Sequence, residues 1–172
     1  TIEVWVWNES VADEESLVSW SRRGPDGLSN MSFNYGVSGS AGAVGRWSGD
    51  MAWGTVPAAG EWRHLAFTYD GSTQIVYSDG VENSRQENLV GVDTYSGVPI
   101  TLGNQRDDAG NLLGHQYQTA SLHMARVRVH DDVLSSAQIL HNYNEEIEDF
   151  TPVPLQGIQI AGELFVDLDA AD

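Results

Sequence analysis

Alternation of apolar and polar residues with a period of two dominates this chain, and the alternating runs are short. Residues 31–36 place Met, Phe and Tyr on one side of a predicted strand and Ser, Asn and Gly on the other. Residues 64–69 repeat the pattern with Leu, Phe and Tyr, and residues 98–102 repeat it with Val, Ile and Leu. Successive side chains of a strand point to opposite faces, so each run predicts a strand with one buried apolar face and one polar face. Short strands separated by glycine-rich turns predict an antiparallel sandwich.

Other segments refine this prediction. Residues 2–7 are apolar on both sides apart from one glutamate, which predicts a central strand covered on both faces. The Asp-Gly pairs at 70–71 and 79–80 predict hairpin turns, because glycine supplies the positive φ that such turns need. Within residues 120–130 the apolar positions change parity, and a β-bulge near residues 124–125 explains the change.

One helix is predicted, and it begins after Leu134. Ser135 and Gln138 have the spacing of a capping box, and Leu134 and Ile139 have the spacing of a hydrophobic staple. The helix should be short and should end before Pro152. The sequence therefore predicts an all-β, two-sheet antiparallel sandwich with one short C-terminal helix.

The chain divides into three segments on this pattern. Residues 1–150 form the predicted module, and 172 residues are enough for one ordinary domain. Residues 151–157 contain two prolines and are interpreted as a linker. Residues 158–172 begin a new alternating region.

The charge of the chain excludes two classes of partner. Its formal net charge is -17, from 25 acidic residues against 8 basic ones. Nucleic acids and anionic lipids are bound by clustered basic residues, so we expect neither as a partner. The acid excess is typical of a solvated surface, of calcium binding or of life in salty water. The absence of cysteine excludes disulfides and leaves the compartment open.

No apolar run reaches the roughly 18 residues that span a membrane, so we expect no membrane insertion. The first residues have no signal-peptide pattern, and any export signal is expected outside this sequence.

Five stretches resemble a known family in order and spacing. They are residues 62–71, 76–80, 102–104, 125–129 and 133–139. Together they resemble the central hairpin, closing strands and final helix of the laminin-G-like (concanavalin A-like lectin/glucanase) jelly-roll family. The resemblance implies two packed antiparallel sheets, in agreement with the alternation. It also implies that strands of the sandwich precede the first residue, because such domains usually have others before this strand.

The C-terminal residues 163–169 resemble the opening strand of another copy of such a module. We therefore expect neighbouring modules of the same kind. The alternative is that residues 158–172 complete this sandwich, or that of a neighbouring molecule, as an edge strand.

The sequence contains no recognisable catalytic set. Glycoside hydrolases of this fold resemble one another in a Glu-x-Asp-x-x-Glu strand, and no glutamate here is followed two residues later by aspartate. The chain also has no Gly-x-Ser-x-Gly turn, no cysteine nucleophile and no histidine pair at metal-binding helical spacing. We expect no catalysis.

Calcium is the candidate cofactor, because it binds carboxylate, amide and carbonyl oxygens on loops. Asn104, Asp107 and Asp108, with Asn111 nearby, are the candidate ligands. An exposed turn made of turn-forming residues explains the same cluster. The acidic residues 167–172 match only the first half of a calcium loop.

A sugar-binding site needs an aromatic face beside polar groups that bind hydroxyls. Trp47 and Trp53 flank a glycine-rich loop that contains Asp50, and Arg22 and Arg23 lie in a turn. These five residues are the candidate ligand-binding set. The arginine pair could instead form ion pairs within the protein. The remaining tryptophans, at positions 5, 7, 20 and 62, are predicted to pack in the core.

The sequence thus predicts a non-catalytic module that binds glycans or a protein surface and belongs to a larger secreted or cell-surface protein. The alternatives are a purely architectural repeat and a carbohydrate-active enzyme with an unrecognised site.

Overall fold

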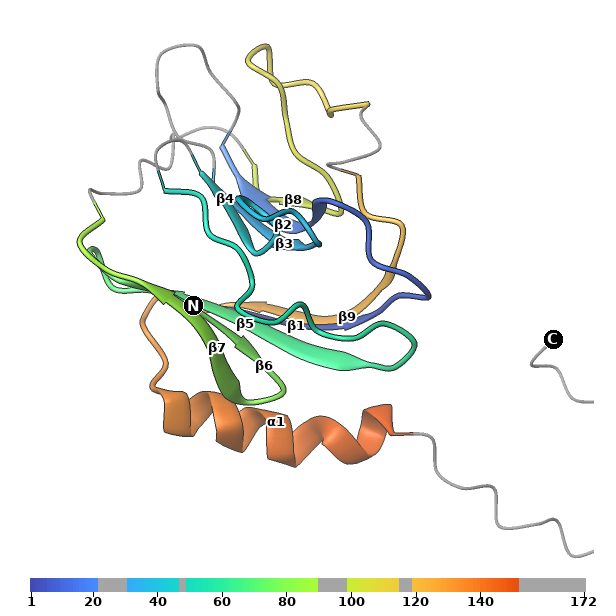
Figure 1. The fold of residues 1–172 in the computed structure, drawn as a ribbon, viewed down its shortest axis with the longest axis vertical. Helices are drawn as coiled ribbons and strands as arrows, with labels where there is room; N and C mark the ends of the chain where they lie inside the picture. Colours follow the sequence, from blue (N-terminus) through green and yellow to red (C-terminus); the bar gives the residue numbers. More distant parts are fainter. Residues whose placement is uncertain (22–30, 47–48, 90–98, 115–118, 152–172) are drawn as a thin grey trace, which may run out of the picture.

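The chain folds into two antiparallel sheets and one helix in the computed structural model, which describes residues 1–21, 31–46, 49–89, 99–114 and 119–151 (Figure 1). The five-stranded sheet has the order β7-β6-β5-β1-β9 and the four-stranded sheet the order β4-β3-β2-β8. The first sheet contains β1 (Ile2–Trp7), β5 (Arg63–Tyr69), β6 (Gln74–Ser78), β7 (Val81–Gln86) and β9 (His123–Val129). The second contains β2 (Glu15–Trp20), β3 (Met31–Tyr35), β4 (Val44–Arg46) and β8 (Thr101–Leu102). The predicted jelly-roll sandwich is confirmed.

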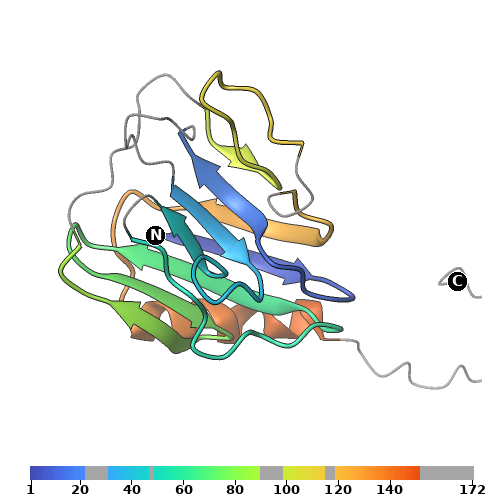
Figure 2. The ribbon, with the colours of Figure 1, turned by 45° about the horizontal axis from the view of Figure 1, so that its top comes forward.

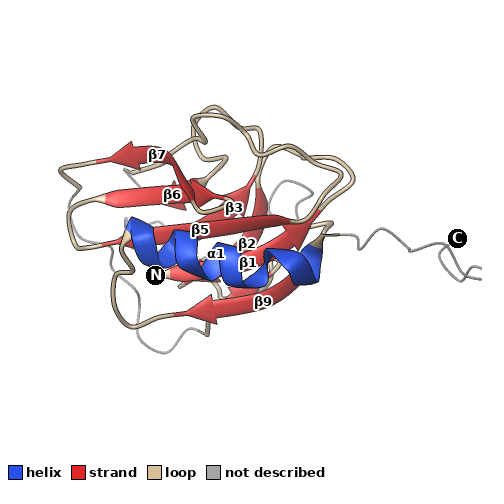
Figure 3. Cartoon of the chain, turned by 90° about the horizontal axis from the view of Figure 1, so that it is seen from below, coloured by secondary structure: helices blue, strands red, loops and turns tan. Residues whose placement is uncertain are grey.

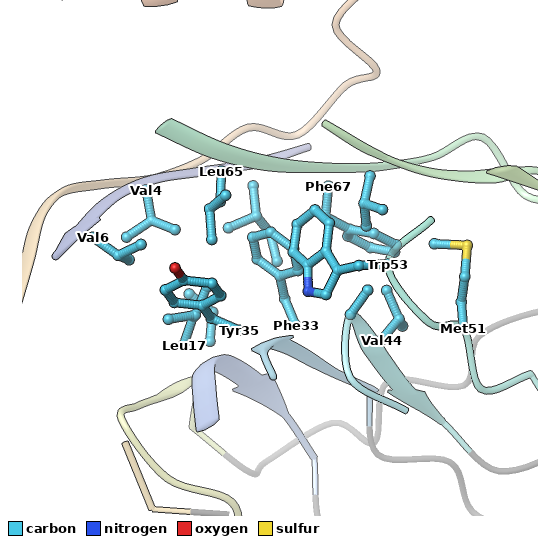
Figure 4. Close-up of a cluster of buried hydrophobic side chains, with 14 of the residues drawn as sticks. Val4, Val6, Leu17, Phe33, Tyr35, Val44, Met51, Trp53, Leu65 and Phe67 are labelled. Atoms are coloured by element: carbon cyan, nitrogen blue, oxygen red, sulfur yellow. The ribbon is translucent and has the colours of Figure 1, made fainter. Parts of the chain in front are cut away.

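The hydrophobic core lies between the two sheets, which face each other (Figure 2). The apolar sides of the alternating strands meet there, as Figure 4 shows for Val4, Val6, Leu17, Phe33, Tyr35, Val44, Leu65 and Phe67. The rings of Phe33 and Phe67 are 5.9 Å apart across the interface. Burial of these side chains, at about 1.5–3 kcal/mol each, holds the two layers together.

The helix α1 (Ser136–Phe150) covers the outer face of the five-stranded sheet (Figure 3). Ile139 is its buried residue, packed against Tyr77 of β6. At the other end of the helix, the indole Nε1 of Trp5 donates a hydrogen bond to Glu146 Oε2 at 2.6 Å. β1 is therefore covered by the second sheet on one face and by α1 on the other, as its sequence predicts.

A carboxylate is buried in this second interface. Glu3 is 0% exposed, and its oxygens accept hydrogen bonds from the Asn142 amide at 3.0 and 3.1 Å. His130 Nε2 lies 2.8 Å from Glu3 Oε2, and His64 Nε2 lies 3.4 Å from Glu3 Oε1. Burial acts to raise the pKa of Glu3, but His64, Asn142 and His130 together outweigh it and hold the pKa below its usual value.

The predicted turns and helix cap are present. Ser78 pairs with Val81 across a two-residue loop, in which Asp79 and Gly80 have φ of 52° and 78°. The other hairpin contains Gly71 at φ 102°. The Ser135 side chain accepts a hydrogen bond from the backbone of Gln138, whose own side chain accepts one from the backbone of Ser135, which forms the capping box.

The predicted bulge is also present in β9. Glu3 pairs with Arg128 and Trp5 with Ala125, so three steps along β9 match two along β1. The extra residue falls at 126–127, where Arg126 has φ 49°, just beyond the predicted position. This bulge causes the change of parity in the sequence.

The polar side of β3 differs from its prediction, because Ser32 and Asn34 are buried. Ser32 Oγ lies 3.0 Å from Ser16 Oγ on β2, and the Asn34 amide donates to Ala41 O at 2.8 Å. The chain after β8 places Gln105 over these residues, where its amide donates to Ser16 Oγ at 2.8 Å. A covered polar network, rather than a solvated face, therefore forms the outer side of this sheet.

The prediction of a buried apolar side for residues 98–102 is wrong where the structure describes it. Ile100 and Leu102 are 43% and 51% exposed. β8 is an edge strand, so no further strand of the described chain covers this side. Val98 lies outside the described residues.

Candidate functional site

Strand register brings six strand ends together at one end of the sandwich. In the four-stranded sheet, Trp20 pairs with Met31, and Met31 pairs with Arg46. In the five-stranded sheet, Ile2 pairs with Phe67 on one side and with Val129 on the other. The two rows face each other at the sandwich end where β1 begins.

A cavity of about 380 Å³ opens between these two rows, and we call it the end pocket. Its apolar lining includes the half-buried rings of Trp20 and Tyr69. The Tyr69 hydroxyl donates to Gly71 O at 2.8 Å, and the Arg46 guanidinium lies 5.7 Å from the centre of the same ring. The ring of Tyr69 is thus held in place from two sides.

The remaining lining of the end pocket is polar and mostly acidic, with Asp70, Asp131 and Asp132. Asp70 Oδ1 accepts hydrogen bonds from the backbone N–H groups of Ser72 and Thr73, at 2.8 and 2.7 Å. These bonds hold the pKa of Asp70 below its usual value. Asp131 and Asp132 are exposed. The pocket therefore combines aromatic surface with charged hydrogen-bond acceptors.

Three residues of the predicted ligand-binding set lie outside the described residues. They are Arg22, Arg23 and Trp47. Asp50 is exposed, and its Oδ1 accepts a hydrogen bond from the backbone N–H of Arg46 at 2.8 Å. Strand connectivity therefore places the Asp50 loop next to the end of β4.

The prediction that Trp53 binds a ligand is wrong, because the structure places this side chain in the core. It is 6% exposed, packs against Phe33, and donates its indole N–H to Gly42 O at 3.0 Å. A ring with both faces enclosed cannot stack on a ligand. The neighbouring Gly54, which suggested an exposed loop, instead lies against the backbone of Asn83, whose O would be 2.5 Å from an added Cβ.

The predicted calcium ligands lie in a loop that is already hydrogen bonded. Asp107 Oδ1 accepts the backbone N–H of Asn111 at 2.7 Å, and this bond lowers the pKa of Asp107. Asn104 Oδ1 accepts the backbone N–H of Gln105 at 2.7 Å. Asp108 is exposed. No group of three or more His, Cys, Asp or Glu side chains able to hold a metal occurs among the described residues, and calcium at this loop stays a prediction.

A second cavity, of about 270 Å³, lies where the end of α1 meets β1 and β5, and we call it the helix pocket. Its lining includes the half-buried rings of Trp7, Trp62, Tyr143 and Phe150. Sequence reasoning assigned the two tryptophans to the core and missed this pocket. Their positions at and just outside strand ends, Trp7 closing β1 and Trp62 preceding β5, are the signal that could have indicated partial exposure.

Trp5 is fully buried, as predicted, and Trp20 packs against the edge of the core while it lines the end pocket. Among the described residues, no helix is long and apolar enough to cross a membrane.

The fold defines the class of protein: an antiparallel β-sandwich of two sheets with a helix on its outer face. A model of the concanavalin A-like lectin/glucanase superfamily matches residues 1–140. The chain belongs to this superfamily, which confirms the family resemblance of the sequence.

Solved structures share the fold at low sequence identity. A putative carbohydrate binding protein from Bacteroides ovatus has 16% identity and a TM-score of 0.55, with 81% of this chain and 39% of that chain covered. Domain 4 of AbnA, a GH43 extracellular arabinanase from Geobacillus stearothermophilus, in complex with arabinotriose, has 23% identity and a TM-score of 0.58. The match covers 81% of this chain and 64% of that chain. A native heptameric SAP-like pentraxin from Limulus polyphemus has 13% identity and a TM-score of 0.55. The match covers 81% of this chain and 67% of that chain.

This chain spans less than two thirds of the first two of these structures. No curated protein matches the sequence. At these identities the likeness establishes the fold.

Proposed function

We propose that this chain is a non-catalytic carbohydrate-binding module of a larger secreted or cell-surface protein, and that the end pocket holds the sugar. The observation that carries the proposal is the pairing of the Trp20 and Tyr69 rings with three carboxylates in one cavity. An aromatic ring stacks on the C–H face of a sugar, and carboxylates accept hydrogen bonds from its hydroxyls. The described structural neighbours that bind carbohydrates support the same assignment.

A neutral, hydroxyl-rich sugar fits the end pocket better than a uronic acid does. Asp70, Asp131 and Asp132 repel an anionic ligand. Arg22 and Arg23, which follow β2, remain candidates for contacts at the rim, together with Trp47 and Asp50. Calcium bound by Asn104, Asp107 and Asp108 is part of the proposal as a candidate cofactor.

The chemistry of the pocket supports a binding role over a hydrolytic one. Retaining hydrolysis needs a carboxylic acid with a raised pKa about 5 Å from a nucleophilic carboxylate. The pKa of Asp70 is lowered by its backbone hydrogen bonds, which is the opposite of what a general acid requires. The sequence also lacks the paired-carboxylate strand of the glucanases.

A glycan array followed by calorimetry tests the proposal. We expect binding of a neutral oligosaccharide that Asp131→Ala and Trp20→Ala each weaken by about tenfold, the effect of losing roughly 1.4 kcal/mol. Glu148→Ala, which removes an exposed acid of α1, is the matched control and should leave the affinity unchanged. Chelation of divalent ions before titration tests the calcium requirement.

An array without a bound sugar, or Asp131→Ala and Trp20→Ala proteins that bind as tightly as the parent, would contradict this assignment. Release of reducing sugar by the purified protein would replace it with an enzymatic one.

A second candidate function, contact with a neighbouring module, rests on the open side of the sandwich. Ile100, Leu102 and Leu112 are 43–55% exposed at and near the edge strand β8. Exposed apolar residues beside an unpaired edge are typical of surfaces that receive another chain segment. Sequencing of the parent gene tests this candidate, and a gene without further copies of the module would remove it.

A further inference from the structure

The helix pocket is separate from the end pocket, because the two lie at opposite ends of β1. Ile2 lines the end pocket and Trp7 lines the helix pocket. Five residue steps of a strand separate them by about 17 Å. None of the described residues lines both cavities, so a ligand in one does not occupy the other.

Aromatic rings from two layers of the molecule form the apolar walls of the helix pocket. Trp7 comes from β1, Trp62 from the segment before β5, and Tyr143 and Phe150 from α1. The Trp62 and Phe150 rings are 5.0 Å apart and inclined at 56°, so they do not lie flat on one another. Phe150 is stacked on Trp5 at 4.1 Å and 10°, whereas Trp7 and Trp62 reach the cavity from other elements. Aromatic rings from several elements around one cavity resemble the arrangement that binds cationic ligands through their π faces.

The charged side chains in the wall of this pocket are bonded to one another and to the backbone. All three nitrogens of Arg63 are bonded: Nε to Ala58 O at 3.0 Å, Nη1 to Asp79 Oδ2 at 2.7 Å, and Nη2 to Glu61. The second oxygen of Asp79 accepts the backbone N–H of His64 at 3.0 Å. These charged groups are therefore held in position by contacts within the protein.

The electrostatics of the pocket favour a cation. Two carboxylates, Glu61 and Asp79, stand against the single guanidinium of Arg63, which leaves one net negative charge in the wall. α1 also ends at the pocket with Phe150, and its last turn contains no basic residue. The C-terminal end of a helix carries a partial negative charge, so it adds to the attraction.

We propose that the helix pocket binds a quaternary ammonium group of the trimethylammonium type. Such a group has no N–H to donate and is attracted both to aromatic faces and to negative charge. A primary ammonium, in contrast, is more strongly hydrated, so it loses more when an aromatic pocket desolvates it. Arg126 already lies over Phe150, 5.0 Å from the ring centre, but it does not line the pocket.

Calorimetry with choline and its uncharged isostere 3,3-dimethylbutan-1-ol tests the proposal on the full chain. The two ligands have nearly the same shape and differ in charge. We expect choline to bind at least about tenfold more tightly, the ratio that a cation–π contribution of about 1.4 kcal/mol produces. Higher salt should weaken the binding of choline and leave the binding of the uncharged isostere unchanged.

Two pairs of variants locate the site. Trp62→Ala should abolish choline binding, whereas Trp62→Phe should retain most of it because an aromatic face remains. Glu61→Gln should weaken it severalfold by removing one negative charge. Asp131→Ala, in the end pocket, should leave choline binding unchanged while it weakens sugar binding, so the two sites can fail independently.

Phosphatidylcholine vesicles distinguish a lipid headgroup from a soluble source of the same group. Co-sedimentation that Trp62→Ala abolishes would assign the headgroup, and binding of choline without co-sedimentation of the vesicles would assign a soluble ligand. Equal affinity for choline and its isostere, or no binding of choline up to about 100 mM, where even very weak sites are occupied, would overturn the proposal. A neutral sugar that displaces choline from the pocket would overturn it as well.

Discussion

Glu3 shows how one polar residue in an apolar strand can organise an interface. It interrupts the otherwise apolar run of β1 and faces α1, where Asn142, His64 and His130 surround its carboxylate. An isolated buried charge would be strongly destabilising, so these partners are a condition of its burial. They also give the interface a pH dependence.

We expect Glu3→Gln to lower the free energy of unfolding by about 1–3 kcal/mol at neutral pH, because charged hydrogen bonds are lost. The pKa of Glu3 is lowered in the fold. Its contribution is therefore fully present above the unfolded pKa of about 4.3 and is lost as the pH falls through the lower folded pKa. The gap between the parent and Glu3→Gln should shrink from pH 5 to pH 3 in urea unfolding curves.

Glu148→Gln is the control for this experiment, since Glu148 is exposed on the same helix. Its curve should follow that of the parent at every pH. A gap between the parent and Glu3→Gln that stays constant down to pH 3 would contradict the account of Glu3.

At the scale of elements, the contact between the β6–β7 turn and α1 couples a tight turn to helix packing. Gly80 has φ 78°, and a Cβ added there would lie 2.7 Å from Leu140 Cδ1 and 3.1 Å from Leu140 Cα. Gly71, in the β5–β6 turn, has φ 102° but no atom within 4 Å of an added Cβ. The two glycines share the backbone requirement and differ in their surroundings.

Gly80→Ala should therefore destabilise the protein more than Gly71→Ala does. Both substitutions strain a left-handed residue by about 1–2 kcal/mol, and the first adds about 1–3 kcal/mol because the helix must shift. Equilibrium urea unfolding of the two variants measures the difference. Equal losses would show that α1 yields to the added methyl group without cost.

At the scale of the whole molecule, a net charge of -17 opposes the compact state. The ion pairs around α1, such as Arg128 with Glu146 and Arg126 with Asp149, offset only part of this repulsion. Salt that screens the remaining charges should stabilise the fold.

We expect the melting temperature to rise when NaCl is increased from 0.05 to 0.5 M, by about 2–4 °C for each kcal/mol gained. KCl should act equally, because screening does not depend on the identity of the ion. An additional rise on adding millimolar calcium at constant ionic strength would instead indicate a specific site, the one predicted at Asn104, Asp107 and Asp108. A melting temperature that falls or stays level with NaCl would contradict the charge argument.

The sequence by itself determined several elements of this protein, although it did not locate β2 or β4. Alternation located β3 and β5, the Asp-Gly pairs located two turns, the parity change located the bulge, and the capping box located α1. Each of these signals is local, because it depends on residues a few positions apart along one strand, turn or helix end.

Only the tertiary structure decided which faces are covered and where cavities open. Ser32 and Asn34 are buried because the distant Gln105 covers them. Trp53 is enclosed in the core, where its indole N–H donates a hydrogen bond to the distant Gly42 O. For the same reason, Trp7 and Trp62 line a pocket beside Phe150 and do not pack in the core as predicted. Exposure of a side chain is set by residues far away in the sequence, so no local pattern could reveal it.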